Sequence, residues 1–183
     1  MTKINDTPSY FNQYFDVSDL PETLSNEKYN TCNVSCLGMI TQLHPDVILN
    51  YMFNKYGVND KYQWEENIIQ YLTDNGYTTK PVTALAWPYE RKITDEELEV
   101  IRAEIDKGNV ILYHKSGHYQ LLIGYMDKNN YVFNDPAGNR RLPLTERESE
   151  SGHKVVYSVS MLKSEPLYGR CWSVNLKKEE EQR

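Results

Sequence analysis

The sequence is poor in cysteine, since Cys32, Cys36 and Cys171 are its only thiols among 183 residues. A small, odd number argues against the disulfide framework on which many small secreted domains depend. The thiols therefore act as core residues, metal ligands or nucleophiles, and the surrounding pattern has to decide among these roles.

Positive charge is also scarce. The formal net charge is −6, and the basic runs are short, such as the pairs at residues 140–141 and 177–178. A nucleic-acid-binding surface needs clustered Lys and Arg side chains to neutralise phosphates. We therefore expect no nucleic-acid partner.

Long apolar runs are missing as well. Residues 1–15 contain no apolar segment of signal-peptide length, and stretches such as residues 121–123 are far too short to cross a bilayer. We therefore expect a cytoplasmic protein with no membrane partner. The composition, with 39% hydrophobic and 25% charged residues, is typical of a globular protein, and the length fits a single domain.

Helical patterns fill the first half of the chain. Apolar residues recur at helical spacing after Cys32, and Pro45 is suited to the first turn of a second helix. Thr94 and Glu97 have the spacing of a capping box. We expect helices over residues 34–43, 45–56, 62–74 and 94–107.

Strand patterns fill the second half. We expect strands over residues 109–114, 117–127, 131–135, 155–159 and 171–176. Helices followed by an antiparallel sheet indicate an α+β architecture. The predicted single domain comprises an irregular N-terminal arm (1–30), a helical part (31–108), an antiparallel sheet (109–176) and a charged tail (177–183).

Cys32 is the best candidate for a nucleophile. A catalytic thiol needs surroundings that favour the thiolate, a nearby base and donors for the oxyanion. Cys32 lies where the polar arm meets the first expected helix, and the N-terminus of a helix favours a negative charge. Cys36 lies one turn further, on the same face as Ile40, and is interpreted as a small core residue.

His118 and Asp135 are the candidates for base and orienting carboxylate. His118 opens an apolar strand after Gly117, and Asp135 ends the next strand. If these strands pair around the turn at residues 128–130, the two side chains lie at the same end of the hairpin. There the carboxylate can hydrogen-bond the imidazole and stabilise its protonated form.

Other roles for these residues remain open. Cys36 is an alternative nucleophile and His114 an alternative base, whereas Asp135 precedes a proline and could serve only to form a turn. Cys32 and His118 could be structural. His44 and His153 are interpreted as surface residues.

A zinc site is a further alternative. Cys32 and Cys36 have Cys-x3-Cys spacing and could be joined by His118 or Cys171. No second pair with ligand spacing occurs in the sequence. We therefore expect neither a metal nor another cofactor.

Three segments together carry a family resemblance: NTCNVSCLGM at residues 30–39, GHY at 117–119 and NDPAG at 134–138. The chain resembles, over residues 26–176, the bacteriocin-leader-processing (double-glycine) peptidases, in their stand-alone leader-peptidase-like branch from bacteria and phages. The resemblance implies a papain-like cysteine peptidase fold, with the Cys on a central helix packed against a sheet carrying His and Asp. Those roles carry over onto Cys32, His118 and Asp135.

Two features depart from the family pattern. Asn33 and Val34 follow the nucleophile where the family has Gly-Pro, and Asn26 stands six residues before it where the family has an oxyanion-stabilising Gln. Asn26 and Asn30 are therefore the candidate oxyanion donors beside the backbone N–H of Cys32.

The expected activity is hydrolysis of a peptide or isopeptide bond in a peptide or protein substrate, through a Cys-His-Asp triad. The alternatives are a peptidoglycan-directed hydrolase or amidase, and a binding protein that keeps the peptidase fold with weak or no turnover. Transfer to an amine in place of water is a further open outcome.

Overall fold

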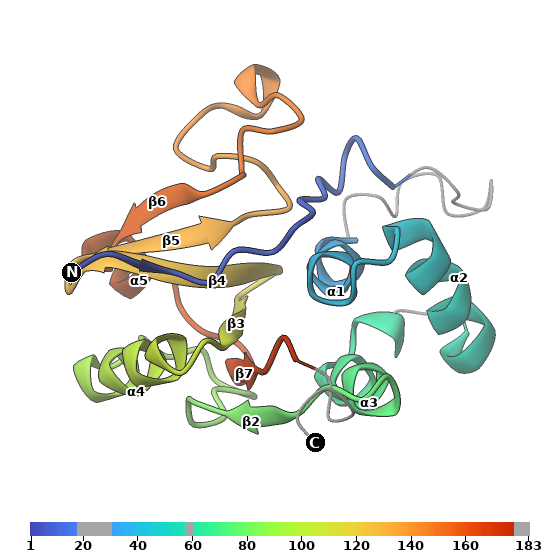
Figure 1. Cartoon of the computed structure of the whole chain (residues 1–183), viewed down its shortest axis with the longest axis horizontal. Coiled ribbons are helices and arrows are strands. Elements are labelled where there is room, and N and C mark those ends of the chain that lie inside the picture. Colours follow the sequence, from blue (N-terminus) through green and yellow to red (C-terminus); the bar gives the residue numbers. More distant parts are fainter. Residues whose placement is uncertain (18–30, 58–60, 178–183) are drawn as a thin grey trace.

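The computed structural model describes residues 1–17, 31–57 and 61–177. In the described residues the helices are α1 (Cys32–Thr41), α2 (Pro45–Tyr56), α3 (Glu65–Asp74), α4 (Asp95–Asp106) and α5 (Val159–Ser164), with 3-10 turns η3 (Lys61–Gln63) and η4 (Leu144–Glu146). The strands are β1 (Lys3–Ile4), β2 (Thr79–Pro81), β3 (Val110–Lys115), β4 (His118–Asp127), β5 (Asn130–Asn134), β6 (Val155–Ser158) and β7 (Trp172–Val174). Figure 1 shows α1, α2 and α3 gathered beside the sheet, and α4 beneath it.

The predicted α+β class, with helices mainly before an antiparallel sheet, is confirmed. Three short elements depart from the predicted parts: β1 lies in the arm, β2 in the helical part and α5 in the sheet part. β1 and β2 have too few residues to show a periodicity. The strand predicted to Val159 ends one residue earlier, because the Ser158 side chain accepts a hydrogen bond from the Met161 N–H and caps α5.

The strands form one antiparallel sheet in the order β2-β7-β3-β4-β5-β6. β1 pairs with the second half of β4, beyond the end of its pairing with β3. Gly124 permits this pairing, because a Cβ atom there would collide with the backbone oxygen of Lys3. The N-terminal strand therefore extends the sheet where β3 leaves β4 uncovered.

Two hydrophobic cores flank the central strands. Leu121 and Ile123 belong to the core shared with α1, whereas Leu122 between them belongs to the core that includes Ile101 of α4. This alternation follows from the period of two along a strand. β4 is therefore buried on both faces, which makes its first residue a rigid position from which to present a side chain.

Helix α1 lies between the sheet and the other helices of its half. All residues from Cys32 to Ile40 are buried, and α1 contacts α2, α3 and β4. A helix that is buried on every side needs mainly apolar or small residues, and the polar Asn33 among them donates a side-chain hydrogen bond to the Tyr62 backbone oxygen (2.8 Å). Its N-terminus, where Cys32 lies, meets the beginning of β4.

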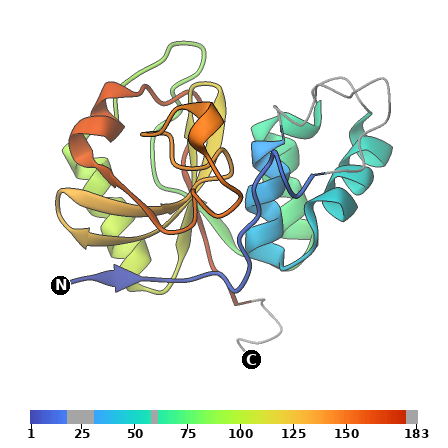
Figure 2. The same ribbon diagram turned by 90° about the horizontal axis from the view of Figure 1, so that it is seen from above.

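The N-terminal arm joins the two halves of the molecule. The Asn5 side chain donates hydrogen bonds to the backbone oxygens of Ile105 (2.6 Å) and Asn109 (2.8 Å). Further along, the Tyr10 hydroxyl donates to the backbone oxygen of Asp135 (2.6 Å). Figure 2 shows this segment following the sheet before it crosses to the helices. The arm, predicted to be irregular, thus includes a paired strand and ordered contacts over residues 1–17.

Some predicted features lie outside the described residues, including Asn26, Asn30 and most of the charged tail. Across the parts of the chain that are described, no helix combines the length and the apolar character needed to cross a membrane.

Candidate active site

Cys32 occupies the first position of α1. Its side chain lies at the start of β4, where the Tyr119 N–H donates a hydrogen bond to the Cys32 Sγ (3.4 Å). Cys32 is only 7% exposed, yet it lines a cavity. The sulfur therefore lies at a helix N-terminus and accepts a hydrogen bond from a backbone N–H.

His118 and Asp135 meet at one end of the β4–β5 hairpin. His118 is the first residue of β4, and Asp135 directly follows Asn134, the last residue of β5, which pairs with Leu121. This register places the His118 Nε2 at 2.7 Å from the Asp135 Oδ1. With Nε2 engaged by the carboxylate, Nδ1 is the ring nitrogen left to interact with Cys32.

The charges of this group are strongly coupled. Burial by itself would lower the pKa of His118, but the charge of Asp135, its hydrogen bond and the Cys32 side chain outweigh burial and raise this pKa to about 9. Burial would raise the pKa of Asp135, but the charge and hydrogen bond of His118, together with the charge of Arg140, hold it well below its usual range. The arrangement therefore favours imidazolium and carboxylate at neutral pH.

The carboxylate of Asp135 is fully buried and accepts five hydrogen bonds. Oδ1 accepts from His118 and Oδ2 from three other side chains, so each oxygen has its own set of donors. The donors are His118 Nε2 (2.7 Å) and the Ala137 N–H (3.0 Å) to Oδ1, and Gln120 Nε2 (2.6 Å), Tyr157 OH (2.7 Å) and Arg140 Nε (2.8 Å) to Oδ2. This network fixes the carboxylate, and through it the plane of the imidazole.

A cavity of about 1240 Å³ opens beside Cys32 and His118. Its walls come from α3, the loop before α4, the β3–β4 turn and the loop before β7. Large rings line it while remaining exposed: Trp64 (49%), Trp87 (58%) and Tyr168 (39%). Exposed apolar surface of this kind, next to the Cys32 thiol, is suited to binding apolar parts of a ligand.

His114 lies in the same cavity but has different partners. Its Nδ1 is 3.4 Å from Glu65 Oε2, and its ring stacks on Tyr119 with centroids 3.9 Å apart. Gly169 passes so close that a Cβ atom there would collide with both side chains of the pair. His114 is thus held by Glu65 rather than by the Asp135 network.

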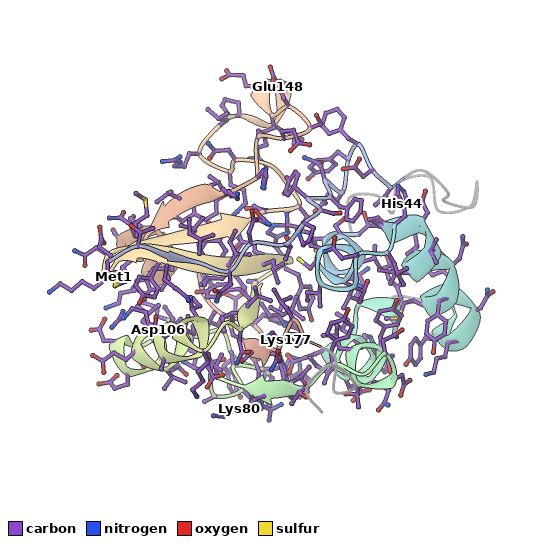
Figure 3. The ribbon with its side chains drawn as sticks, viewed as in Figure 1. Met1, His44, Lys80, Asp106, Glu148 and Lys177 are labelled. Atoms are coloured by element: carbon purple, nitrogen blue, oxygen red, sulfur yellow. The ribbon has the colours of Figure 1, made fainter. Side chains whose placement is uncertain are left out.

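The other cysteines and histidines lie apart from this group. Cys36 is fully buried in the core with α1, and Cys171 is fully buried in the core with α4. Within the described ranges, no three His, Cys, Asp or Glu residues are grouped so that they could hold a metal ion. The His44 side chain is 50% exposed, and Figure 3 shows it beside α2, on the other side of α1 from the sheet. His153 has a 35% exposed side chain.

Comparison with family models connects this geometry to known proteins. The model of the Peptidase_C39 like family matches residues 7–157, which is most of the chain and includes Cys32, His118 and Asp135. The chain belongs to the Peptidase_C39 like family. Comparison with curated proteins and with solved structures found no significant match.

Membership of the Peptidase_C39 like family agrees with the predicted resemblance and with a papain-like fold. It also indicates cysteine peptidase chemistry as the general activity. The matched range ends at Tyr157, the donor to Asp135 on β6, so it contains most of the sheet that supports the candidate site.

Sequence reasoning missed the residues that support Asp135. The sequence does indicate Gln120 as a neighbour of the site, because it is two residues after His118 and so projects from the same face of β4. No sequence pattern indicates a role for Arg140, since its position depends on the path of the loop after β5. In the sequence it is simply one member of a short basic pair. It instead has an 11% exposed side chain and pairs with both Asp135 and Glu165.

The raised pKa of His118 predicts a loss of stability at alkaline pH. Because its pKa in the folded chain, about 9, exceeds the ordinary 6.5, its contribution is complete below pH 6.5 and is lost as the pH rises through 9. Between pH 6.5 and 9.5 the free energy of unfolding should fall by up to about 3 kcal/mol more in the native chain than in His118→Ala. Urea titrations at both pH values measure this, with His44→Ala as the control that should behave like the native chain.

Proposed function

We propose that the chain is a cysteine peptidase in which Cys32 attacks the carbonyl carbon of an amide bond. His118 serves as the acid–base group, and Asp135 orients and stabilises its protonated form. The observation that carries this proposal is the arrangement of the three side chains. The imidazole lies between a buried carboxylate at 2.7 Å and the thiol at the start of α1, beside an open cavity.

The reaction follows from these positions. The sulfur–carbon bond forms as the Cys32 thiolate attacks, and the carbon–nitrogen bond breaks as the His118 imidazolium gives its proton to the leaving amine. Neutral His118 then takes a proton from water, whose oxygen attacks the thioester carbon. The carbon–sulfur bond breaks, the acid product leaves, and the thiolate–imidazolium pair is restored.

The tetrahedral intermediates require donors to their oxyanion. The backbone N–H of Cys32 is at the first turn of α1, where helical N–H groups have no partner within the helix. Asn26, which stands where the family has an oxyanion-stabilising Gln, or Asn30 is proposed as the second donor.

The proposed substrate is a peptide or protein segment that lies along the cavity. A volume of about 1240 Å³ accommodates several residues of an extended chain, and its exposed rings suit apolar side chains. Neither a nucleic acid nor a membrane is proposed as a partner.

The Tyr168→Ala variant should bind such a substrate more weakly. Tyr168 lines the cavity beside His114 and is 39% exposed, so its removal takes away contact area with the substrate but little core packing. We expect KM for a cleaved peptide to rise about five- to tenfold, equivalent to about 1 kcal/mol of lost apolar contact, with kcat nearly unchanged. Tyr89→Ala is the matched control, because Tyr89 is 81% exposed and does not line the cavity. Equal effects of the two variants would contradict the assignment.

Two measurements test the proposed function. Limiting iodoacetamide at pH 6 should alkylate Cys32 much faster than it alkylates glutathione, while the buried Cys36 and Cys171 serve as internal controls. Incubation with a mixed peptide library should then yield new termini that a Cys32→Ala variant does not produce. Alkylation of Cys32 no faster than that of a free thiol would contradict the catalytic proposal.

Together, the labelling rate and the products formed from peptides, from peptidoglycan and in the presence of an amine separate the competing functions. Rapid labelling without any cleavage would favour a binding protein with the peptidase fold. Release of soluble fragments from peptidoglycan, with none from peptides, would favour a wall-directed amidase. Products linked to an added amine would indicate transfer in place of hydrolysis.

A further inference from the structure

Behind Asp135 lies a charged group that takes no direct part in the proposed reaction. Arg140 Nε donates to Asp135 Oδ2 (2.8 Å), and its Nη1 and Nη2 donate to the two carboxylate oxygens of Glu165 (2.6 and 2.9 Å). The guanidinium also lies over the ring of Tyr157, 5.0 Å from its centroid. A guanidinium group that donates hydrogen bonds to carboxylates on two sides in this way is held in one orientation.

The group continues to the neighbouring strand. Lys115 Nζ is 3.3 Å from Glu165 Oε2, and Lys115 is the register partner of His118 across β3 and β4. Positive and negative groups therefore alternate. The chain of charges runs His118, Asp135, Arg140, Glu165, Lys115, and its members have side chains that are 25% exposed or less.

We propose that Arg140 is a positioning residue that sets, through Asp135, how readily His118 holds and releases its proton, and that Glu165 moderates this influence. The proposal rests on the proposed function, because such a role has a purpose only if His118 exchanges protons with Cys32 and the substrate.

The need for Arg140 arises when His118 becomes neutral. After His118 has given its proton to the leaving amine, Asp135 is a buried carboxylate that has lost its neighbouring cation. Breaking a buried ion pair in this way is strongly unfavourable unless another charge compensates. Arg140 remains protonated and hydrogen-bonded throughout, so Asp135 can stay ionised and keep the ring oriented.

Arg140 also opposes the positive charge on His118. A fixed cation near the pair disfavours the imidazolium, whereas Glu165 partly cancels that cation. Among the described residues, the other ionisable groups near His118 or Asp135 include Cys32 and Cys36 from α1, Lys115 from β3, Tyr157 from β6 and Tyr10 from the N-terminal arm. Removing Arg140 and removing the charge of Glu165 should therefore shift the titration of His118 in opposite directions.

The test is an NMR titration of the His118 ring in the full chain. The signal is identified among four histidines by its absence in His118→Gln. We expect the midpoint to move up by about one pH unit in Arg140→Gln and down by about half a unit in Glu165→Gln, while Arg140→Lys, which keeps the charge, stays near the native value. Shifts of the same sign, or no shift in either charge variant, would overturn the proposal.

Two additional sets of variants allow the NMR titration to decide the proposal even if one variant fails to fold. If Arg140→Gln does not fold, Glu165→Gln and Arg140→Lys decide, since the Glu165 side chain is 25% exposed and Arg140→Lys preserves the cation. The titrations are repeated in Cys32→Ala, where the opposite shifts should persist. Slow alkylation of native Cys32 would refute the proposed function, whereas the sign of the His118 shifts judges the role of Arg140 separately.

Discussion

The His118→Ala variant should lose nearly all of the special reactivity of Cys32. At pH 6 an unassisted thiol, with an ordinary pKa of about 8.5, is only about 0.3% ionised, so its alkylation is slow. Without the imidazolium to stabilise the thiolate, the rate constant for iodoacetamide at pH 6 should fall by roughly 100-fold. Peptide cleavage should fall by about 1000-fold or more, because both the acid and the base of the proposed cycle are gone.

His114→Ala is the matched control for this prediction. His114 lines the same cavity and also lies near a carboxylate, that of Glu65 at 3.4 Å, but it is outside the Asp135 network. Its replacement should leave the alkylation of Cys32 within about threefold of the native rate. Loss of reactivity in His114→Ala together with a normal rate in His118→Ala would reverse the assignment of the base.

The Asp135→Ala variant should be the most destabilised of the single substitutions considered. The native carboxylate is fully buried and accepts five hydrogen bonds, two of them from the cationic side chains of His118 and Arg140. Removing one partner of a buried ion pair leaves uncompensated charge and unsatisfied donors. We therefore expect a loss of about 3–5 kcal/mol in the free energy of unfolding, measured by urea denaturation at pH 6.5.

Asp127→Ala provides the comparison at the other end of the same hairpin. The Asp127 carboxylate also accepts hydrogen bonds, from the Asn129 N–H and the Asn130 side chain, but in an exposed turn. It should change the free energy of unfolding far less than Asp135→Ala does. Similar losses in the two variants would mean that the buried network contributes little to stability.

Much of the fold was predictable because local patterns determine it. Pro45 at the first position of α2 and the capping box of Thr94 and Glu97 at α4 act within a few residues, and both are present in the structure. The alternation along β4 arises in the same local way. Short elements such as β1 were not predictable, because two residues carry no period and their pairing depends on a distant strand.

The candidate site was likewise predictable only where local structure determines it. A short turn between β4 and β5 brings His118 and Asp135 to one end of the hairpin, so their proximity followed from the sequence. Cys32 is 86 residues before His118, and its approach to β4 required the packing of α1 against the sheet.

The sequence by itself determined the α+β class, the family resemblance and the three residues proposed for catalysis, because each depends on composition, period or a short motif. Only the tertiary structure decided what surrounds those residues. Arg140 and Glu165 come from separate loops, and the cavity joins α3 to the loops before α4 and β7. Contacts between distant segments depend on how loops cross the packed sheet, and no local pattern in the chain encodes those paths.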